Sequence, residues 1–471
     1  MTLTAELVDL LGTARVLDHP LRRHVYGKDG GVTRGDVELV CLPDTTSEVV
    51  EIVRIARRHG LPVIPRGAGT GLAGGAVPLG PAVMIVLTRM DRIEDVDVES
   101  KTAWVGPGVI NLELSQHTHR HGLHYAPDPS SQSTCTVGGN VATNAGGLHC
   151  LAEGTTVAHV LAVEMVTADG EVVTLGGEAP DPIGLDLRAV AVGSEGTLGV
   201  VTRVLVRLTE NAPASQTLLL AFDDIENAAA TVSAIISEGI VPGALEMMDR
   251  VTVEAVENYV HAGFPTEAAA VLLAEIVGTS AGVAAEANRV ASIARANGAI
   301  DVEIASSPAQ AALWWKGRKS AFGAVAQAAP DYYLHDTVVP RTKLVEVLRA
   351  VYAIGRKYDL LMMNVFHAGD GNLHPLMAYD SAQPGVLDRV HAAAEEIVRA
   401  SIAAGGALSG EHGIGIEKRD LMGLTFGPVD LDAQARLREA FDPEQVFNPG
   451  KVLPEGSRCF DYGRPPVGAE A

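Results

Sequence analysis

The segment Pro65-Arg66-Gly67-Ala68-Gly69-Thr70-Gly71-Leu72-Ala73-Gly74-Gly75 decides the fold, and it follows a predicted strand at residues 61–64. It contains GxGxxG at residues 69–74, which in a nicotinamide-binding fold joins a strand to a helix. A crossover between parallel strands needs a dozen or more residues with a helix. Only seven residues, two of them proline, precede the next predicted strand at residues 83–87, so we expect neither helix nor parallel crossover. The segment instead suits phosphate binding by backbone N–H groups beside Arg66; the alternative is a flexible surface turn.

Two further segments, residues 127–147 and 193–200, also combine small side chains, hydroxyl groups and free backbone donors. In this order the three segments resemble the FAD-binding domain of the vanillyl-alcohol oxidase superfamily. The resemblance implies that the first segment holds the diphosphate of FAD and that the other two hold the rest of the cofactor. Contacts to FAD are expected from Arg66, Gly67, Ala68, Gly69, Thr70, Gly71, Leu72, Pro127, Asp128, Thr134, Gly138, Gly139, Asn140, Ala142, Thr143, Glu195, Gly196, Gly199 and Val200.

The FAD is expected to be bound without a covalent link. The loop of residues 66–75 contains no His or Cys that could form one, and Cys135 is interpreted as a packed thiol. A turn at residues 447–451 follows a short predicted helix, and it is suited to presenting Asn448 to an edge of the cofactor.

The sharpest chemical signal is the segment Phe366-His367-Ala368-Gly369-Asp370-Gly371-Asn372-Leu373-His374. Asp-Gly is a strong hairpin signal, and with Asp370 and Gly371 at the centre of the turn His367 pairs directly with His374. Residues paired in this way lie on one face, about 5 Å apart. We therefore predict that His367 and His374 bind one metal ion.

A third ligand is expected from Glu411, in the segment Ser409-Gly410-Glu411-His412-Gly413. Two His and one Glu leave a coordination position open, as in a catalytic site, and Zn²⁺ or Mn²⁺ suits these ligands. Neighbours in an extended loop point in opposite directions, so His412 is expected to stay off the metal and to act as a base. The alternative is a pair of hydrogen-bonded core histidines and an exposed Glu.

Arg318 lies in the segment Trp314-Trp315-Lys316-Gly317-Arg318, which places basic groups beside aromatic ones. Its guanidinium is the candidate for binding a substrate carboxylate through two parallel hydrogen bonds. The alternative is a surface Arg whose stem packs on Trp315.

The hairpin and the Gly-Glu-His-Gly segment, together with Asn448-Pro449-Gly450-Lys451, resemble the FAD-linked 2-hydroxyacid oxidases and dehydrogenases. Segments at residues 331–333, 338–341 and 364–366 make the chain most similar to the D-type catalytic subunits of glycolate oxidase. The resemblance implies that the metal polarises the substrate, Arg318 holds its carboxylate, His412 removes the hydroxyl proton and hydride passes to flavin N5.

The resemblance also implies an α+β fold in two main parts, a FAD-binding domain of two subdomains at residues 38–213 and a ferredoxin-like cap at residues 214–455. The last segment of the cap is expected to return to the flavin, with a helical segment at residues 1–37 and a tail at residues 456–471. Helices are expected to cover one face of the cap sheet. Further strands are predicted at residues 103–105, 160–167, 171–175, 199–208, 218–222 and 270–277, and helices at residues 225–238, 281–297 and 386–404.

Two positions bear on the substrate. Relatives that act on 2-hydroxyglutarate tend to carry Asn where this chain has Leu376, and a small hydroxyl residue where it has Phe322. Both differences remove polar partners for a second carboxylate, so glycolate or D-lactate is the expected substrate. The alternatives are a D-2-hydroxyglutarate dehydrogenase, a metal hydrolase with the same His and Glu ligands but no flavin, and a flavoprotein subunit without catalytic activity.

Composition limits the partners. A net charge of −22 argues against nucleic acid, and 47% hydrophobic with 20% charged residues excludes wholesale disorder. The sequence shows no signal peptide and no apolar stretch of about 20 residues. Four cysteines without a CxxC pair suit a reducing compartment, so we expect a cytoplasmic protein, or one held at the inner face of the membrane by partners.

The expected partners, besides the 2-hydroxy acid, are an electron acceptor and further subunits of a glycolate oxidase complex, including an iron–sulfur subunit. The chain has no iron–sulfur or haem ligands of its own to carry electrons onward. A homo-oligomer or a heteromer is expected.

Overall fold

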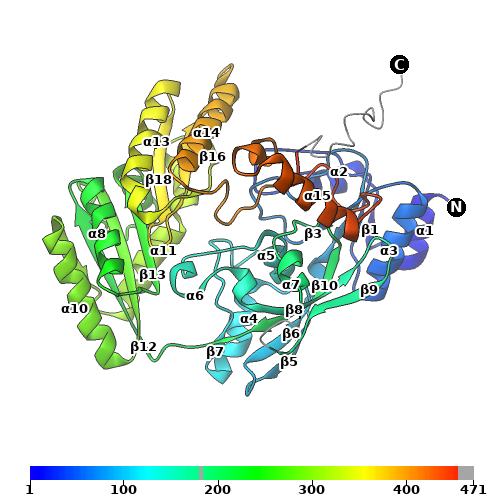
Figure 1. The fold of residues 1–471 in the computed structure, drawn as a ribbon, viewed down its shortest axis with the longest axis horizontal. Helices are drawn as coiled ribbons and strands as arrows, with labels where there is room; N and C mark the ends of the chain where they lie inside the picture. The colour runs from blue at the N-terminus through cyan, green and yellow to red at the C-terminus, as the bar shows by residue number, and fades with distance from the viewer. Residues whose placement is uncertain (180–183, 455–471) are drawn as a thin grey trace.

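The computed structural model describes residues 1–179 and 184–454 (Figure 1). In these residues the first half of the chain forms two main sheets and a two-stranded pair, and the second half forms a third main sheet. The first sheet contains, in spatial order, β1 (Val16–Leu17), β2 (Leu39–Cys41), β4 (Val83–Val86) and β3 (Val63–Arg66). Helices α1 (Leu3–Leu11) and α3 (Thr46–Arg58) bury apolar residues against this sheet. Helix α2 (Pro20–His24) lies between β1 and β2 in the chain, so the N-terminal segment contributes a strand as well as helices.

The predicted phosphate loop connects β3 to β4. Residues 67–82 contain no helix, as expected. The inference that the two strands cannot be parallel is wrong, because Val63 pairs with Val83 in a parallel register. The irregular segment 67–82 is itself long enough to serve as the crossover, and it leaves its backbone groups free for a ligand.

The second sheet is antiparallel, with β5 (Ile93–Asp97), β6 (Thr102–Val105), β10 (Val200–Arg207), β8 (Val160–Val166) and β9 (Val172–Gly176) in spatial order. Strands β6, β8, β9 and β10 lie within about two residues of their predicted positions, whereas β5 was not predicted. The same part of the chain contains α4 (Asn111–Thr118), β7 (Leu123–His124), α5 (Val137–Thr143), α6 (Cys150–Glu153), α7 (Leu187–Ala191) and β11 (Thr209–Glu210).

The third sheet belongs to the cap. It begins with a β-α-β-β-α-β unit made of β12 (Ala214–Phe222), α8 (Ile225–Ser237), β13 (Ala244–Asp249), β14 (Ala270–Gly278), α10 (Ser280–Ala296) and β15 (Ala299–Ile304). The spatial order is β15, β12, β14 and β13, and every pair is antiparallel, which is a ferredoxin-like arrangement. Beyond β13 the sheet continues with β16 (Asp331–Leu334), β17 (Thr337–Val338), β18 (Leu361–His367), β19 (Asn372–Leu373) and β20 (Pro375–Tyr379).

Helices cover both faces of the cap sheet, so the prediction of one covered face is wrong. Leu218 and Leu220 of β12 share a core with α8, α10, α13 (Leu344–Tyr358) and α14 (Val386–Ala403). Leu219 and Ala221 face a second core with α9 (Arg250–Val260), α11 (Pro308–Lys319) and α12 (Ala321–Ala324). A strand buried on both faces has a continuous apolar run instead of alternation, and residues 218–222 have one.

The chain returns to its N-terminal part after α14. Helix α15 (Pro428–Phe441), orange-red in Figure 1, lies beside the blue segments of the first sheet. The backbone N–H of Val63 donates to the carbonyl of Val446 (2.7 Å), and the N–H of Asn448 donates to the carbonyl of Val63 (2.9 Å). This return brings residues 409–418 and 446–452 close to the glycine segments. The predicted tail lies outside the described residues.

Candidate active site

A cavity of about 620 Å³ lies between the three glycine-containing segments and the loop that carries Glu411 and His412. Its wall contains fifteen of the residues predicted to contact FAD, namely Arg66, Gly67, Ala68, Gly69, Thr70, Gly71, Leu72, Gly138, Gly139, Asn140, Ala142, Thr143, Glu195, Gly196 and Gly199. The glycine segments and the Glu-His loop are far apart in the sequence, yet they open into one space.

Five residues predicted to contact FAD do not line the cavity, and they are Pro127, Asp128, Thr134, Val200 and Asn448. Asp128 is ion-paired with His149 at 2.9 Å, and Val200 belongs to the apolar core of the first sheet. Pro127, Asp128, Val200 and Asn448 are buried in protein and Thr134 is exposed to solvent, although their segments border the cavity. Neighbours such as Ser130, Ser131 and Thr136 take their place in its wall.

Asn448 is also placed differently from the prediction. Its Nδ2 donates to the carbonyls of Gly75 (2.7 Å) and Glu195 (2.8 Å), and its Oδ1 accepts from Nζ of Lys451 (3.0 Å). The side chain is 1% exposed. Asn448 therefore ties the first and third segments together, and both polar atoms of its side chain are hydrogen-bonded to protein.

The backbone approaches its neighbours closely at the first segment. A Cβ atom on Gly67 would lie 2.4 Å from Oγ1 of Thr136, and Gly69 has a φ of +75° with the Arg66 guanidinium directly against it. Nη2 of the buried Arg66 donates to the carbonyl of Lys28 (2.9 Å), whereas Nη1 has no partner among the described residues. A buried cation with an unpartnered nitrogen beside a glycine-rich loop fits the diphosphate of FAD.

Glu195 connects the third segment to the loop after His412. Its carboxylate accepts the backbone N–H groups of Ile414 (2.7 Å) and Gly415 (2.8 Å). Burial raises the pKa of Glu195 to about 7, against the opposing effect of these two hydrogen bonds and of Lys451. The wall of the cofactor cavity and the candidate catalytic loop are therefore held together by one side chain.

The histidine hairpin forms with a different register from the predicted one. His367 pairs with Asn372, not with His374, so the turn contains four residues instead of two. Gly371 has a φ of +84°, and a Cβ atom there would lie 2.1 Å from the carbonyl oxygen of Val339. The observed register differs from the predicted one by two residues. Because successive side chains alternate between the two faces of a sheet, His367 and His374 still share one face. Their ring centroids lie 5.0 Å apart.

The three predicted metal ligands come together. Nε2 of His367 and Nε2 of His374 lie 3.3 Å and 3.1 Å from Oε1 of Glu411. Both rings are buried, and Oε2 of Glu411 and Nε2 of His374 have no hydrogen-bond partner among the described residues. Two imidazoles and a carboxylate whose ligand atoms lie within 4.8 Å of one another can hold one cation.

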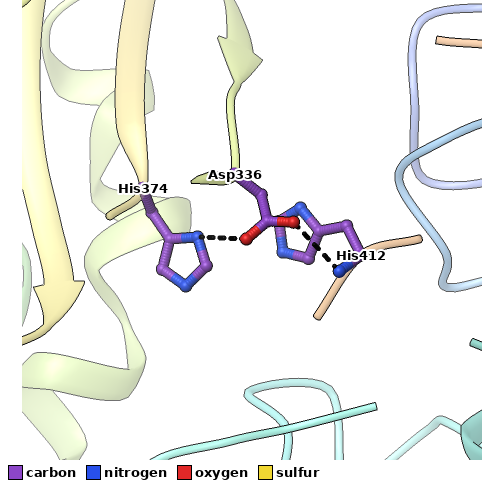
Figure 2. Close-up of side chains that lie close together, drawn as sticks. All are labelled: Asp336, His374 and His412. Atoms are coloured by element: carbon purple, nitrogen blue, oxygen red, sulfur yellow. Dashed lines mark hydrogen bonds and ion pairs between the residues drawn. The ribbon is translucent and has the colours of Figure 1, made fainter. Parts of the chain in front are cut away.

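Two buried carboxylates face the outer nitrogens of these histidines. Nδ1 of His367 donates to Oε1 of Glu246 at 2.8 Å. Nδ1 of His374 lies 3.9 Å from Oδ1 of Asp336 (Figure 2). Carboxylates in this position are typical partners of metal-binding histidines, because they leave Nε2 unprotonated for the metal.

The charges of the cluster favour a cation at its centre. Burial by itself would lower the pKa of His367, but Glu246 and Glu411 hold it well above its ordinary value. Burial would raise the pKa of Glu411, but His367 and His374 hold it well below. Positive charge, whether a proton or a metal ion, is therefore stabilised between these side chains.

His412 lies against the cluster from the other side. Its ring stacks on that of His374, with centroids 5.1 Å apart and an 11° angle, and its Nε2 lies 3.9 Å from Oε1 of Glu411. The two neighbouring side chains converge, so the expectation that they point in opposite directions is wrong for this bent loop. Burial lowers the pKa of His412 to about 4 despite the opposing charge of Asp336, so its imidazole is neutral near pH 7.

Arg318 is fully buried, so the alternative of a surface Arg is wrong. Its Nη2 is ion-paired with Oε2 of Glu246 at 2.5 Å, while Nε and Nη1 have no hydrogen-bond partner among the described residues. Arg318 does not line the cavity, but the adjacent Lys319 and the nearby Phe322 do. Two guanidinium nitrogens without a hydrogen-bond partner therefore lie behind the cavity wall, and Arg318 and His367 are joined through the carboxylate of Glu246.

Sequence reasoning missed Glu246, Asp336 and Lys418. Glu246 is one of six consecutive buried residues in β13, and Asp336 lies in the two-residue link between β16 and β17. A carboxylate within a buried strand is a usable signal, because such a group needs a partner. The identity of that partner depends on tertiary contacts and could not be read from the sequence.

Comparisons with known proteins place this site in context. The family described as "FAD binding domain" matches residues 37–176, and "FAD linked oxidases, C-terminal domain" matches residues 212–452. The chain is 45% identical to glycolate oxidase subunit GlcD of Escherichia coli K12, over 90% of this chain and 85% of that protein. It is 34% identical to a D-lactate dehydrogenase of Anaerostipes hadrus, over 91% and 90% of the two chains.

Among solved structures, p-cresol methylhydroxylase with substrate bound superimposes with a TM-score of 0.81 over 96% of both chains, at 16% identity. At this identity the likeness concerns the fold alone, and it confirms the predicted fold class. Within residues 1–179 and 184–454, no helix combines the length and the apolar character that a membrane span requires.

Proposed function

Because the chain belongs to the family of FAD-linked oxidases, we propose that it oxidises a small 2-hydroxy monocarboxylate, glycolate or D-lactate, to the 2-oxo acid. One observation carries this proposal: the cavity that would hold FAD extends to Glu411 and His412. A flavin and the His-Glu cluster can therefore act on the same substrate. The names of the relatives, a glycolate oxidase subunit and a D-lactate dehydrogenase, support this class of substrate.

His367, His374 and Glu411 would hold one divalent ion, Zn²⁺ or Mn²⁺, and the residues lining the cavity would hold FAD without a covalent link. The unpartnered Nε2 of His374 and Oε2 of Glu411 support the metal, and the unpartnered Nη1 of Arg66 supports the diphosphate. When bound, the ion acts as a Lewis acid on the substrate hydroxyl and FAD takes up the electrons.

The side chains of this protein supply positioning and proton transfer. Nε2 of His412 would take the proton of the substrate hydroxyl, since the ring is neutral and close to the cluster. The free Nε and Nη1 of Arg318 would bind the substrate carboxylate, and Glu246 would hold the guanidinium in place. The buried setting strengthens these interactions.

The shape of the site supports a small substrate. Phe322 lines the cavity and lies edge-on to His374, with ring centroids 6.3 Å apart. An aromatic wall at this position leaves no polar partner for a second carboxylate. Leu376 contributes differently, because its side chain is fully buried in the core of the cap.

The route of the electrons beyond FAD is part of the proposal. Within the described part of the chain the cysteines are free, and they are Cys41, Cys135 and Cys150. We propose that a separate acceptor, with an iron–sulfur subunit of a glycolate oxidase complex favoured, would receive the electrons of the reaction. A homo-oligomer or heteromer, in the cytoplasm or held at the inner face of the membrane by partners, would accommodate this transfer.

A steady-state assay with an artificial electron acceptor tests the function. The purified protein should be yellow, and it should oxidise glycolate or D-lactate with a kcat/KM at least tenfold above that for D-2-hydroxyglutarate. A colourless protein that hydrolyses esters would favour the metal hydrolase, and a yellow protein inactive with all three acids would favour a subunit without catalytic activity.

A further inference from the structure

We infer that Asp336 is the positioning residue of this site, and that its single carboxylate fixes the loop that carries Glu411 and His412 and places a negative charge beside the ring of His374. This inference rests on the proposed function. Asp336 lies between β16 and β17 of the cap and is 0% exposed (Figure 2). Its position makes it the common neighbour of the two parts of the site.

The loop at residues 409–412 wraps around this carboxylate. Oδ2 of Asp336 accepts the hydroxyl of Ser409 and the backbone N–H groups of Gly410 (3.0 Å), Glu411 (3.3 Å) and His412 (3.1 Å). Three successive N–H groups that converge on one oxygen fix the direction of the peptide planes between them. The side chains of Glu411 and His412 leave this curved backbone on the side of His374.

The other oxygen of Asp336 faces the ring of His374. Oδ1 lies 3.9 Å from Nδ1 of His374, while Nε2 of the same ring lies 3.1 Å from Oε1 of Glu411. Oδ1 makes no hydrogen bond to Nδ1 at this distance, but its negative charge favours a proton on Nδ1 over one on Nε2, the nitrogen that faces Glu411. Loss of such outer partners typically lowers metal affinity by about 10–100-fold.

A competing interpretation is a second metal site. The ligand atoms of Asp336, His374 and His412 lie within 4.8 Å of one another, as three ligands of one ion would. However, Nζ of Lys418 donates to Oδ2 of Asp336 (3.1 Å) and to its carbonyl (2.6 Å). A buried ammonium at this distance repels a divalent cation, and Oδ2 already has its donors. The geometry therefore favours a positioning role over metal binding.

Amide hydrogen exchange and zinc affinity of the holoenzyme test the inference in Asp336→Asn. Exchange in peptides covering residues 409–413 should accelerate at least tenfold, and Zn²⁺ affinity by chelator competition should fall about 10–100-fold. Asp249→Asn is the matched control. Asp249 is equally buried and accepts backbone N–H groups of Thr252 and Asn364, but it has no contact with residues 409–413. The control should change neither readout.

The substitution leaves Lys418 as an unpaired buried charge, which can prevent folding. The double variant Asp336→Asn/Lys418→Met removes that charge, and it should fold and still show faster exchange and weaker zinc binding. Parental exchange at residues 409–413 in either variant would overturn the role of Asp336. A parental protein that does not bind zinc would instead overturn the proposed metal-assisted function, and the exchange readout would still decide the role of Asp336.

Discussion

Glu411 and His412 are neighbours in the chain, and the structure predicts opposite consequences for their substitution. Oε1 of Glu411 is the atom on which the Nε2 atoms of His367 and His374 converge, at 3.3 Å and 3.1 Å. Glu411→Gln removes the only carboxylate among the three proposed ligands. It should lower metal affinity more than about 100-fold, beyond the effect of losing an outer partner, and activity should fall with it.

His412→Asn should leave the metal in place. Nε2 of His412 lies 3.9 Å from Oε1 of Glu411, and the contact of His412 with Asp336 is made by its backbone N–H, which the substitution keeps. Removal of a general base typically costs about 10²–10⁴-fold in rate, or about 3–5 kcal/mol of transition-state stabilisation. The loss should shrink as pH rises, because a more basic medium supplies the substrate alkoxide without the imidazole.

Bound metal and the anaerobic rate of flavin reduction, measured for both variants between pH 6 and pH 9, separate these roles. The expected pattern is a metal-poor Glu411→Gln and a metal-loaded but slow His412→Asn. A metal-free His412→Asn, or one that reduces its flavin at the parental rate, would refute the assignment of His412 as the base. A Glu411→Gln with parental metal affinity would refute its role as a ligand.

Two further predictions follow from buried groups, and a third concerns the link to FAD. Glu246→Gln leaves Arg318 without its partner, so the free energy of unfolding should fall by about 3–5 kcal/mol in thermal denaturation. Adding Arg318→Met to the same chain should restore stability. Parental stability of the single variant would contradict this prediction. Burial raises the pKa of Glu195 to about 7, so the folded state favours its protonated form, and about 3 kcal/mol of stability present below pH 4.5 should be lost as pH rises through 7. Glu195→Gln should flatten this part of the pH–stability curve, and an unchanged curve would show that another group causes it. Acid precipitation should release the yellow chromophore into the supernatant, whereas colour retained in the pellet would reveal a covalent link.

The hairpin illustrates how far the sequence can be interpreted. Asp370 and Gly371 indicate a turn. Side chains alternate between the two faces of a sheet, and loops of two and of four residues differ in register by two. His367 and His374 therefore share a face with either loop. The four-residue loop itself depends on a tertiary contact, since Gly371 packs against the carbonyl of Val339. Local turn rules contain no information about that contact.

The partners of the predicted ligands were beyond sequence reasoning for a related reason. Glu246 is 121 positions from His367 in the chain, and Asp336 meets residues 409–412 only because the cap sheet and the returning segment lie together. The contacts of Asn448 could not be predicted for the same reason. Its side-chain amide lies on the returning segment and donates to the carbonyls of Gly75 and Glu195, which belong to two different loops. Glycine-rich segments and histidine spacing indicate a site, whereas the polar contacts behind it depend on the complete fold.

Anaerobic reduction of the bound flavin tests the central claim most directly. Glycolate or D-lactate is added to the purified holoenzyme while the flavin absorption band is followed, first with metal present, then after exhaustive chelation and again after Zn²⁺ or Mn²⁺ is restored. The proposed function predicts rapid bleaching by one of the two acids, a loss of at least about 100-fold on chelation and recovery with the metal. Full-rate bleaching of the chelated protein, or no bleaching by either acid, would contradict it.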